Sequence, residues 1–288
     1  MLRLLTWNVR YFSNLQGGLR SSTAGLEAIV AALDEVDADL VLLQEVEEDS
    51  WRAGSTGQAQ AERLSDALTR RGLSYTCLYY PAHRYRLGEF VFYTTGLCTL
   101  IGPRLELLAD NSGRPRDITY RRFPSLRPLK QTRVCGHSRL RFEDTEFDLY
   151  NTHLSLPAFL SPQILQLPLR MGWGHNQMEE AKQLLEFIGE RSGPGLLAGD
   201  FNSLPDSPVY RLLTEAGWVD AFRTLLPPEH YARWQTQGMG PLRLHLDHIF
   251  STPEIDWIDA EESHPWGEGR FQNLSDHVPK LCRFRPRR

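Results

Sequence analysis

Residues 195–202 read GLLAGDFN, an apolar run that ends in two polar side chains. The run Gly195–Asp200 is short and apolar, as is typical of a buried β-strand. Gly199 has no Cβ atom and permits a neighbouring chain to approach closely. If the backbone stays extended, the side chains of Asp200 and Asn202 face the same way, because strand side chains alternate. The stretch therefore predicts a strand whose end presents a carboxylate and an amide.

The same arrangement recurs along the chain. Other strand-like runs are Leu2–Val9, Asp39–Gln44, Tyr75–Tyr80, Phe90–Tyr93, Phe147–His153, Leu246–Ser251 and Val278–Phe284. Polar side chains stand at the ends of several runs: Asn8, Gln44 with Glu45, Asn151 with His153, and Asp247 with His248. Strand ends in α/β sheets form ligand crevices above a rigid apolar base, so we expect these groups to converge.

Each polar group also has a structural alternative. Asn8 could close a bulge, Glu45 could cap a turn, and His153 could be a hydrogen-bonded, partly buried histidine. Taken singly, each position favours the structural alternative. A functional site is therefore indicated only by the combination.

Apolar residues at helical spacing predict helices between the strands. The predicted helices are Thr23–Val36, Gln58–Arg71, Asn176–Arg191 and Ser207–Ala216. Ser22 or Thr23 can cap the first helix, and Ser207 followed by Pro208 is typical of a helix start. The alternation of strands and helices predicts a mixed α/β class. With no repeat, low-complexity tract or long linker, we expect one domain over residues 1–288.

The composition is that of an ordinary globular protein. Hydrophobic residues make up 41% and charged residues 24%, which argues against disordered and fibrous classes. No apolar run approaches the roughly 20 residues that cross a bilayer, and Leu2–Val9 carries Arg3 and Asn8, so it indicates a strand rather than a signal peptide. The cysteines are far apart and form no CxxC pair, which argues against a zinc knuckle or a disulfide framework. We expect a cytoplasmic protein, although a leader removed earlier would leave no trace.

Basic residues are concentrated in one segment, although the net charge is −4. The segment 114–141 contains Arg114, Arg116, Arg121, Arg122, Arg127, Lys130, Arg133, Arg139 and Arg141. Its single acid is Asp117. Such a segment could bind a polyanion such as nucleic acid, with Tyr120 and Phe123 as stacking surfaces. The alternative is a solvated hairpin, because charge runs usually form exposed faces.

Two stretches depart from the strand and helix patterns. Leu154–Gly174 is apolar but interrupted by prolines, which predicts a loop. This loop could be a lid, a docking surface for an apolar substrate, or a cover over the core, and the cover is favoured. Ser263–Leu274 combines glycines, charges and Trp266 just before residues 275–277, so we expect it at the rim of the site.

Read in order, several short motifs resemble one family. They are TWNVR at 6–10, LLQEV at 42–46, YNTHL at 150–154, GDFN at 199–202, LDHIF at 246–250 and SDH at 275–277. This series resembles the endonuclease/exonuclease/phosphatase superfamily, which has the DNase I-like fold. The resemblance spans almost the whole chain. It implies a four-layer α/β sandwich of two central mixed β-sheets flanked by helices, and metal-dependent hydrolysis of phosphate esters.

The resemblance also implies a metal site. Glu45 is similar to the family's principal carboxylate ligand of Mg²⁺, with Asn8 and Asp276 near it. Magnesium prefers hard oxygen ligands and takes few protein carboxylates, which suits this set. Mn²⁺ could substitute for Mg²⁺.

The catalytic roles are carried over by position. Asp200 resembles the general base that takes a proton from the attacking water, or else binds a second metal, and Asn202 would orient the water or the phosphate. His153 and His277 would contact non-bridging phosphate oxygens. Asp247 would hold His277 in the correct tautomer. The expected reaction is in-line attack of water on phosphorus, with no covalent intermediate.

The substrate is less clearly indicated. Residues 89–103 fit the family's strand pair only loosely, and LDHIF resembles nuclease-like, sphingomyelinase-like and deadenylase-like members more than abasic-site repair enzymes. The first expectation is a phosphodiesterase acting on nucleic acid through the segment 114–141. The alternatives are a phosphoesterase of lipids, inositol phosphates or other small molecules, and a non-catalytic binding module with the same fold.

Overall fold

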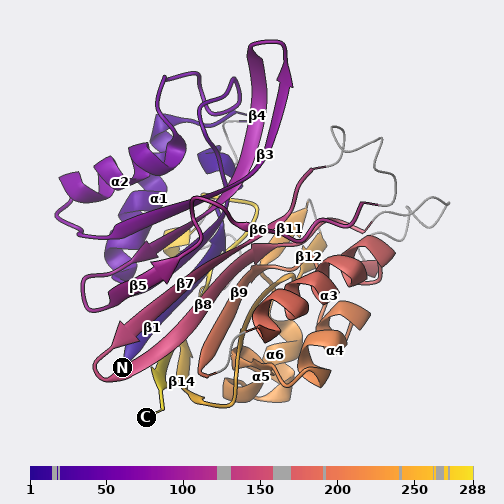
Figure 1. Ribbon diagram of the computed structural model, residues 1–288. Coiled ribbons are helices and arrows are strands. Elements are labelled where there is room, and N and C mark those ends of the chain that lie inside the picture. Colours follow the sequence, from indigo (N-terminus) through magenta and orange to yellow (C-terminus); the bar gives the residue numbers. More distant parts are fainter. Residues whose placement is uncertain are drawn as a thin grey trace.

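Two β-sheets pack face to face at the centre of the molecule (Figure 1). The computed structural model describes residues 1–14, 18, 20–121, 131–157, 170–190, 193–239, 242–261, 263, 269–271 and 273–287. The first sheet has the order β14-β15-β1-β2-β4-β3, and the second has the order β10-β13-β9-β8-β7-β5, with β6 paired to β7. The pairs β1–β2 and β8–β9 are parallel and the other pairs are antiparallel, so both sheets are mixed.

The strands of the first sheet are β1 (Leu2–Asn8), β2 (Leu40–Val46), β3 (Thr76–Leu87), β4 (Phe90–Ile101), β14 (Ile255–Glu261) and β15 (Lys280–Pro286). Those of the second are β5 (Glu106–Asp110), β6 (Arg116–Asp117), β7 (Val134–Phe142), β8 (Thr145–His153), β9 (Gly195–Asp200), β10 (Val219–Asp220) and β13 (Asp247–Ser251). A small separate pair consists of β11 (Gln237–Met239) and β12 (Leu242–Leu244).

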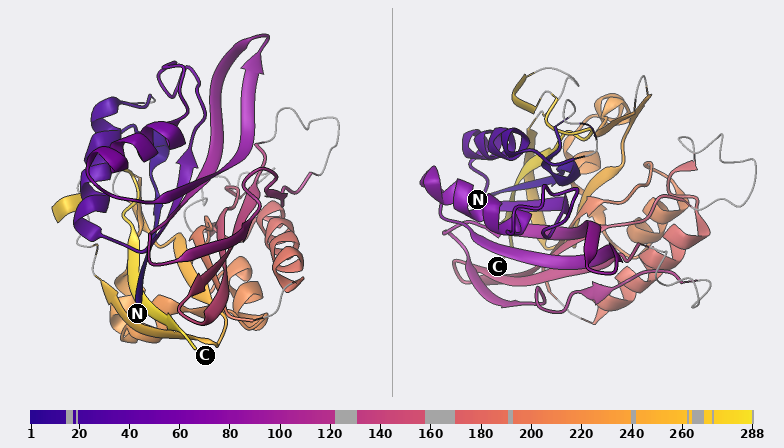
Figure 2. Two further views of the ribbon diagram at one scale, coloured as in Figure 1. Left: turned by 60° about the vertical axis from the view of Figure 1, so that its left-hand side comes forward. Right: turned by 90° about the horizontal axis from the view of Figure 1, so that it is seen from above.

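Helices cover the outer face of each sheet (Figures 1 and 2). The first sheet carries α1 (Thr23–Val36) and α2 (Gln60–Arg70), and the second carries α3 (His175–Gly189) and α4 (Pro208–Glu215). The short helices α5 (Ala221–Leu225) and α6 (Pro228–Arg233) follow β10. The expected four-layer arrangement of helices, sheet, sheet and helices is confirmed.

Local chemistry sets the starts of two helices as the sequence predicted. Ser22 caps α1 and accepts a hydrogen bond from Gly25 N at 2.9 Å. Ser207 caps α4, with Pro208 at the first helical position. The helix predicted from residue 58 begins two residues later, at Gln60. Within the described residues, no helix is both long enough and apolar enough to cross a membrane.

The core has three apolar layers, one between each pair of neighbouring structural layers. Between the sheets, Leu42 of the first packs in one cluster with Leu149 of the second. Outside the first sheet, residues such as Leu33 of α1 cover β2, and outside the second, residues such as Leu184 of α3 cover β9. Each fully buried leucine contributes about 1.5–3 kcal/mol, so these layers give the sheets a rigid base.

Buried polar groups also join the two sheets. Gln44 Nε2 on β2 donates to Asn151 Oδ1 on β8 at 2.9 Å. Asn151 Nδ2 in turn donates to the carbonyl of Cys98 on β4 at 3.1 Å. Buried amides need such partners, so this link fixes how the sheets face one another.

The structure has more strands than the sequence predicted, and two of the predicted strands are longer than expected. The runs 75–80 and 90–93 belong to β3 and β4, which form a long hairpin that extends beyond the layers (Figures 1 and 2). The exposed residues Leu87 and Phe90 lie at its tip. The strands β5, β7 and β14 were not predicted, because charged residues interrupt their apolar pattern.

Candidate active site

The predicted polar strand ends meet at one edge of the sandwich. Asn8 ends β1 and pairs in register with Gln44, whereas His153 ends β8 and pairs in register with Asp200. Since each pair of strands is parallel, their carboxyl ends lie together. The hydrogen bond from Asn8 Nδ2 to Asp200 Oδ2, at 3.0 Å, joins the two sheets at this edge. The expected convergence is therefore present.

The polar groups converge on Asp200, the last residue of β9. Its Oδ2 accepts from Asn8 and lies 3.4 Å from His153 Nε2 and 3.8 Å from His277 Nε2. Burial raises the pKa of Asp200 to about 7, with the charge of Asp247 adding to the rise and His277 opposing it. A carboxyl group with this pKa exchanges protons near neutral pH, as a general base must.

His277 and Asp247 form a buried hydrogen-bonded pair. His277 Nδ1 donates to Asp247 Oδ2 at 2.8 Å, and the carbonyl of His277 accepts from Trp7 Nε1 at 2.9 Å. Burial alone would lower the pKa of His277, but the carboxylates of Asp247 and Asp200 outweigh it and raise the pKa to about 10. The imidazole is therefore protonated at neutral pH and can donate a charged hydrogen bond from Nε2.

His153 lies beside Asn202 at the end of β8. Its Nε2 is 3.3 Å from Asn202 Nδ2, which also donates to the carbonyl of Leu154 at 2.9 Å. Burial, together with the positive charge of Arg133, holds the pKa of His153 well below its usual value. His153 can therefore offer a neutral hydrogen bond rather than a charge.

The extended geometry predicted for residues 200–202 is wrong. The strand ends at Asp200, and Asn202 adopts a left-handed φ of 48°. Asn202 N instead donates to Asp200 Oδ1 at 2.9 Å, which closes a tight turn. The two side chains still reach one site, because the turn brings Asn202 against His153.

Asn8 and Glu45 lie side by side and could hold a hard cation. Asn8 Nδ2 donates to Glu45 Oε1 at 3.2 Å. Glu45 has φ 58° where the pairing of β2 with β4 shifts register, and no ion pair to it forms among the described residues. Asp276 lies close by, since the neighbouring Ser275 Oγ donates to the Asn8 carbonyl at 2.7 Å. Amide and carboxylate oxygens are the donors that Mg²⁺ prefers, so these residues fit that ion.

A second group could also be considered for metal binding. One ligand atom each from Asp200, Asp247 and His277 lie within 4.8 Å of one another. The two carboxylates and the imidazole could therefore hold a second cation on Asp200. Without a metal, the same carboxylates raise the pKa of His277, and the group can take part in proton transfer.

A strained turn that was not predicted from the sequence borders the site. Arg10, Tyr11 and Phe12 follow Asn8 with positive φ values of 43°, 44° and 55°. Each left-handed residue of this kind costs about 1–2 kcal/mol. Asn8 Oδ1 accepts from Arg10 N at 3.0 Å, and Arg10 Nε lies 3.7 Å from Asp276 Oδ2. Strain of this kind is common at functional sites, where surrounding contacts maintain it.

Two arginines near the end of the basic segment 114–141 are paired with acids. Arg139 pairs with Asp148 at 3.0 Å, and Arg141 pairs with Glu106 at 2.8 Å. Both lie toward the end of β7, which runs away from the site because β7 is antiparallel to β8. Residues 122–130 lie outside the described residues, as does most of the apolar loop (158–169) and much of the predicted rim (264–268).

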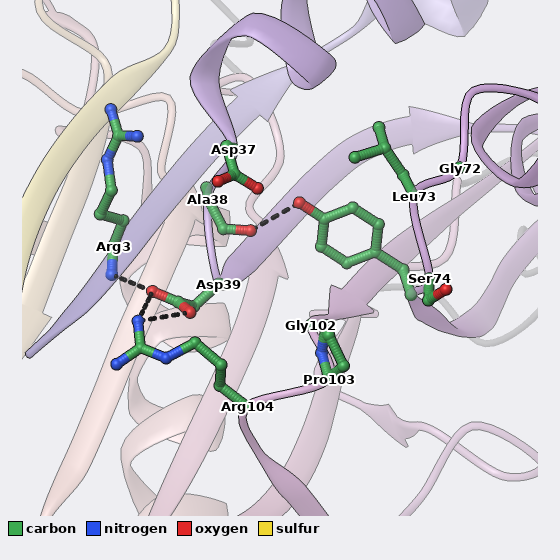
Figure 3. Close-up of a pocket in the computed structure, with 11 residues that line it drawn as sticks. Arg3, Asp37, Ala38, Asp39, Gly72, Leu73, Ser74, Gly102, Pro103 and Arg104 are labelled. Carbon is green, nitrogen blue, oxygen red and sulfur yellow. Dashed lines mark hydrogen bonds and ion pairs between the residues drawn. The ribbon is translucent and has the colours of Figure 1, made fainter.

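A hollow of about 360 Å³ lies at the opposite end of the first sheet (Figure 3). A hydrogen bond and an ion pair fill part of it, since Asp39 accepts from the backbone N of Arg3 at 2.8 Å and from Arg104 Nη1 at 3.0 Å. Asp39 precedes β2, whereas Glu45 lies at the other end of that strand. The hollow is therefore separate from the convergent site.

The sequence of residues 5–277 matches the model of the Endonuclease/Exonuclease/phosphatase family. The chain belongs to this family. Its members are mostly phosphoester hydrolases and generally use divalent metals. A search of curated proteins finds no match.

Solved structures of the family have the same fold. A family protein from Beutenbergia cavernae gives a TM-score of 0.73 at 19% identity, covering 99% of this chain and 72% of that one. The human nocturnin catalytic domain gives 0.67 at 19% identity, covering 99% and 93%. A mannosyl-6-phosphatase from Bacteroides thetaiotaomicron gives 0.64 at 15% identity, covering 99% and 100%. At these identities the likeness establishes the DNase I-like fold alone.

Proposed function

We propose that this chain hydrolyses phosphate esters in a reaction that depends on Mg²⁺, for which Mn²⁺ could substitute. The observation that supports this best is the position of Asp200. Its carboxylate lies at once beside Asn8, which contacts Glu45, and within 3.8 Å of both His153 and His277. A general base, a candidate metal site and two donors for phosphate oxygens therefore surround one point.

The residues suggest a division of labour for in-line attack by water. Asp200 would take the proton of the attacking water, and Asn202 would orient that water or the phosphate. His153 and His277 would donate to non-bridging phosphate oxygens as negative charge develops. A divalent cation held by Asn8, Glu45 and Asp276 would supply Lewis-acid stabilisation of the phosphoryl group.

Two substrate classes remain in competition. A phosphodiester in nucleic acid is the first, but Arg139 and Arg141 are already paired with acids and would have to exchange partners to bind a polyanion. This neutralisation favours the second class, a smaller phosphate ester. A lipid substrate would rest on the loop 154–174, most of which lies outside the described residues.

A panel of substrates tests the proposal. Single- and double-stranded DNA, RNA, sphingomyelin vesicles, an inositol phosphate and bis-p-nitrophenyl phosphate would be incubated with and without Mg²⁺, using the wild type and His277→Ala. We expect Mg²⁺-dependent hydrolysis of at least one ester and a loss of about 10²–10⁴-fold in the variant. Activity on none of them would contradict the proposal and favour a non-catalytic binding module.

A further inference from the structure

Arg133 is a buried cation at the edge of the candidate active site. It directly precedes β7, and only 8% of it is exposed. Its backbone is held on both sides, since Arg133 N donates to Thr119 Oγ1 at 2.7 Å and its carbonyl accepts from Ile118 N at 3.0 Å. The backbone position from which the side chain extends is therefore fixed.

Its guanidinium has no carboxylate partner in the part of the chain that the structure describes. Arg133 Nε donates to Ser155 Oγ at 3.4 Å, and Ser155 Oγ donates to Glu180 Oε1 at 2.8 Å. A guanidinium carries five N–H donors, and the described residues supply an acceptor for one of them. Within the described residues the other donors have no acceptor, so a ligand could supply one.

Arg133 lies on the His153 side of the site. Cys135 pairs with Thr152 in register, so Arg133 and His153 lie at the same edge of the second sheet. Both line one small cavity. Burial lowers the pKa of Arg133, whereas the negative charges of Glu180, Glu45 and Asp200 favour its protonated form. The guanidinium therefore lies within electrostatic reach of the carboxylates of the site.

Burying a positive charge of this kind destabilises the fold unless a group of opposite charge pairs with it. Desolvation disfavours the charged form, and among the described residues Glu180, Glu45 and Asp200 act only through space, since none of them forms an ion pair with the guanidinium that would offset this cost directly. A substrate anion would do so, because the planar guanidinium matches phosphate oxygens in a two-point contact. The position of Arg133 beside His153 therefore points to a phosphate ligand.

Counting the donors that face the phosphate narrows the ligand further. A phosphate diester has two non-bridging oxygens, and a monoester has three. If His277 and His153 each donate to one oxygen, as in the proposed function, a third oxygen for Arg133 exists only on a monoester. We propose that Arg133 binds this third oxygen and so selects terminal phosphate monoesters over diesters, an inference that rests on the proposed function of the site.

The test compares Arg133→Met with the wild type on p-nitrophenyl phosphate and bis-p-nitrophenyl phosphate in Mg²⁺. We expect kcat/KM for the monoester to fall about 100-fold and that for the diester to fall less than about threefold. Arg133→Lys keeps the positive charge but lacks the planar, two-point donor geometry of the guanidinium. Its kcat/KM for the monoester should therefore lie between the values of the wild type and of Arg133→Met. Arg139→Met, on the same strand but distant from the site, is the matched control and should leave both values unchanged.

Binding of orthophosphate gives a readout that does not depend on turnover. By calorimetry in Mg²⁺, we expect Arg133→Met to weaken orthophosphate binding about 10- to 100-fold. Unchanged orthophosphate affinity, or equal losses on the two esters, would overturn the assignment. If Arg133→Met does not fold, Arg133→Lys is compared with the wild type instead. Its kcat/KM must then fall more on the monoester than on the diester. If the wild type hydrolyses neither of these esters nor any substrate of the panel, yet binds orthophosphate through Arg133, the proposed function fails while the phosphate contact stands.

Discussion

Asp200 and His277 are buried side by side, and their pKa values shift in the directions that their proposed roles need. Burial raises the pKa of Asp200 to about 7, so the carboxylate forms only as the pH reaches neutrality. The carboxylates around His277 raise its pKa to about 10, so it stays charged over the same range. The ionised carboxylate of Asp200 and the protonated imidazole of His277 are therefore present together only between a pH of about 7 and a pH of about 10.

This gives a prediction for the pH dependence of activity. We expect kcat/KM to rise as the pH increases through about 7, because Asp200 loses its proton, and to fall as the pH approaches about 10, because His277 loses its proton. A bound divalent cation would shift the acidic limb to lower pH. Steady-state rates in saturating Mg²⁺ between about pH 5 and 11 measure both limbs.

One variant tests whether His277 causes the fall of kcat/KM at high pH. Asp247→Asn removes the charge that contributes most to raising the pKa of His277, so the alkaline limb should move toward neutral pH. The acidic limb should also move to lower pH, because Asp247 raises the pKa of Asp200. An alkaline limb that stays in place in the variant would show that His277 does not cause it.

Single residues were predictable where polar groups end apolar runs. Asp200, His153 and Asp247 stood out in this way, and the structure brings them within contact of one another or of His277. The turn Arg10–Phe12 was not predictable, since its residue types rarely adopt positive φ and only contacts made in the folded protein hold them there. The burial of Arg133 was hidden for a similar reason, because a run of arginines is typical of an exposed face.

Among the strands, β9 contains a glycine, Gly199, whose backbone the neighbouring strand β8 approaches closely. Gly199 has φ 150°, and a Cβ atom there would lie 1.9 Å from the carbonyl oxygen of Thr152 on β8. Because that carbonyl belongs to the paired backbone, it cannot move away without breaking the parallel β8–β9 ladder. The close approach predicted from the sequence is confirmed.

Gly199→Ala should therefore destabilise the protein by about 3 kcal/mol or more. Gly193→Ala is the matched control, since its φ of 109° is also unusual but nothing lies within 4 Å of the added methyl group. It should cost only about 1 kcal/mol. Urea unfolding curves of the three proteins measure both free energies, and equal losses in the two variants would show that backbone conformation rather than contact sets the cost.

Two of the strands that escaped prediction, β7 and β14, share one property. In β7, Arg139 and Arg141 interrupt the apolar pattern, and in β14 acids alternate with apolar residues. Their charges are accommodated by partners on neighbouring strands, such as Glu146 on β8 for Arg139. Those partners lie on other strands and become known only when the strands pair. The composition of one segment alone could therefore not reveal the strand.

A second polar network joins the two sheets behind the site. Asp220 of β10 accepts hydrogen bonds from Tyr231 at 2.8 Å and Tyr210 at 3.0 Å, and Lys280 of β15 lies 2.9 Å from His245. Burial would raise the pKa of Asp220, but the charge of Lys280 and the nearby histidines hold it well below its usual value. Asp220 therefore stabilises the fold above a pH of about 3.9, and this contribution is lost as the pH falls through its lower folded-state pKa.

Asp220→Asn should cost about 3–5 kcal/mol at neutral pH, because it leaves the fully buried Lys280 without its opposing charge. Lys280→Met should also destabilise, because Asp220 then lacks its cation. The double variant should lose less than the sum of the two, by about 1 kcal/mol or more. Urea unfolding of all four proteins closes the cycle, and additive losses would show that the two charges do not interact.

The measurement that tests the central claim most directly is a Mg²⁺ titration of hydrolysis, with whichever ester of the panel the wild type cleaves. It compares Glu45→Gln with the wild type and with Glu48→Gln, a nearby carboxylate paired with Arg84. Loss of a ligand should raise the Mg²⁺ concentration for half-maximal rate at least about tenfold. We predict this shift for Glu45→Gln alone. Superimposable Mg²⁺ curves for all three proteins would contradict a metal-dependent site at the ends of β1 and β2.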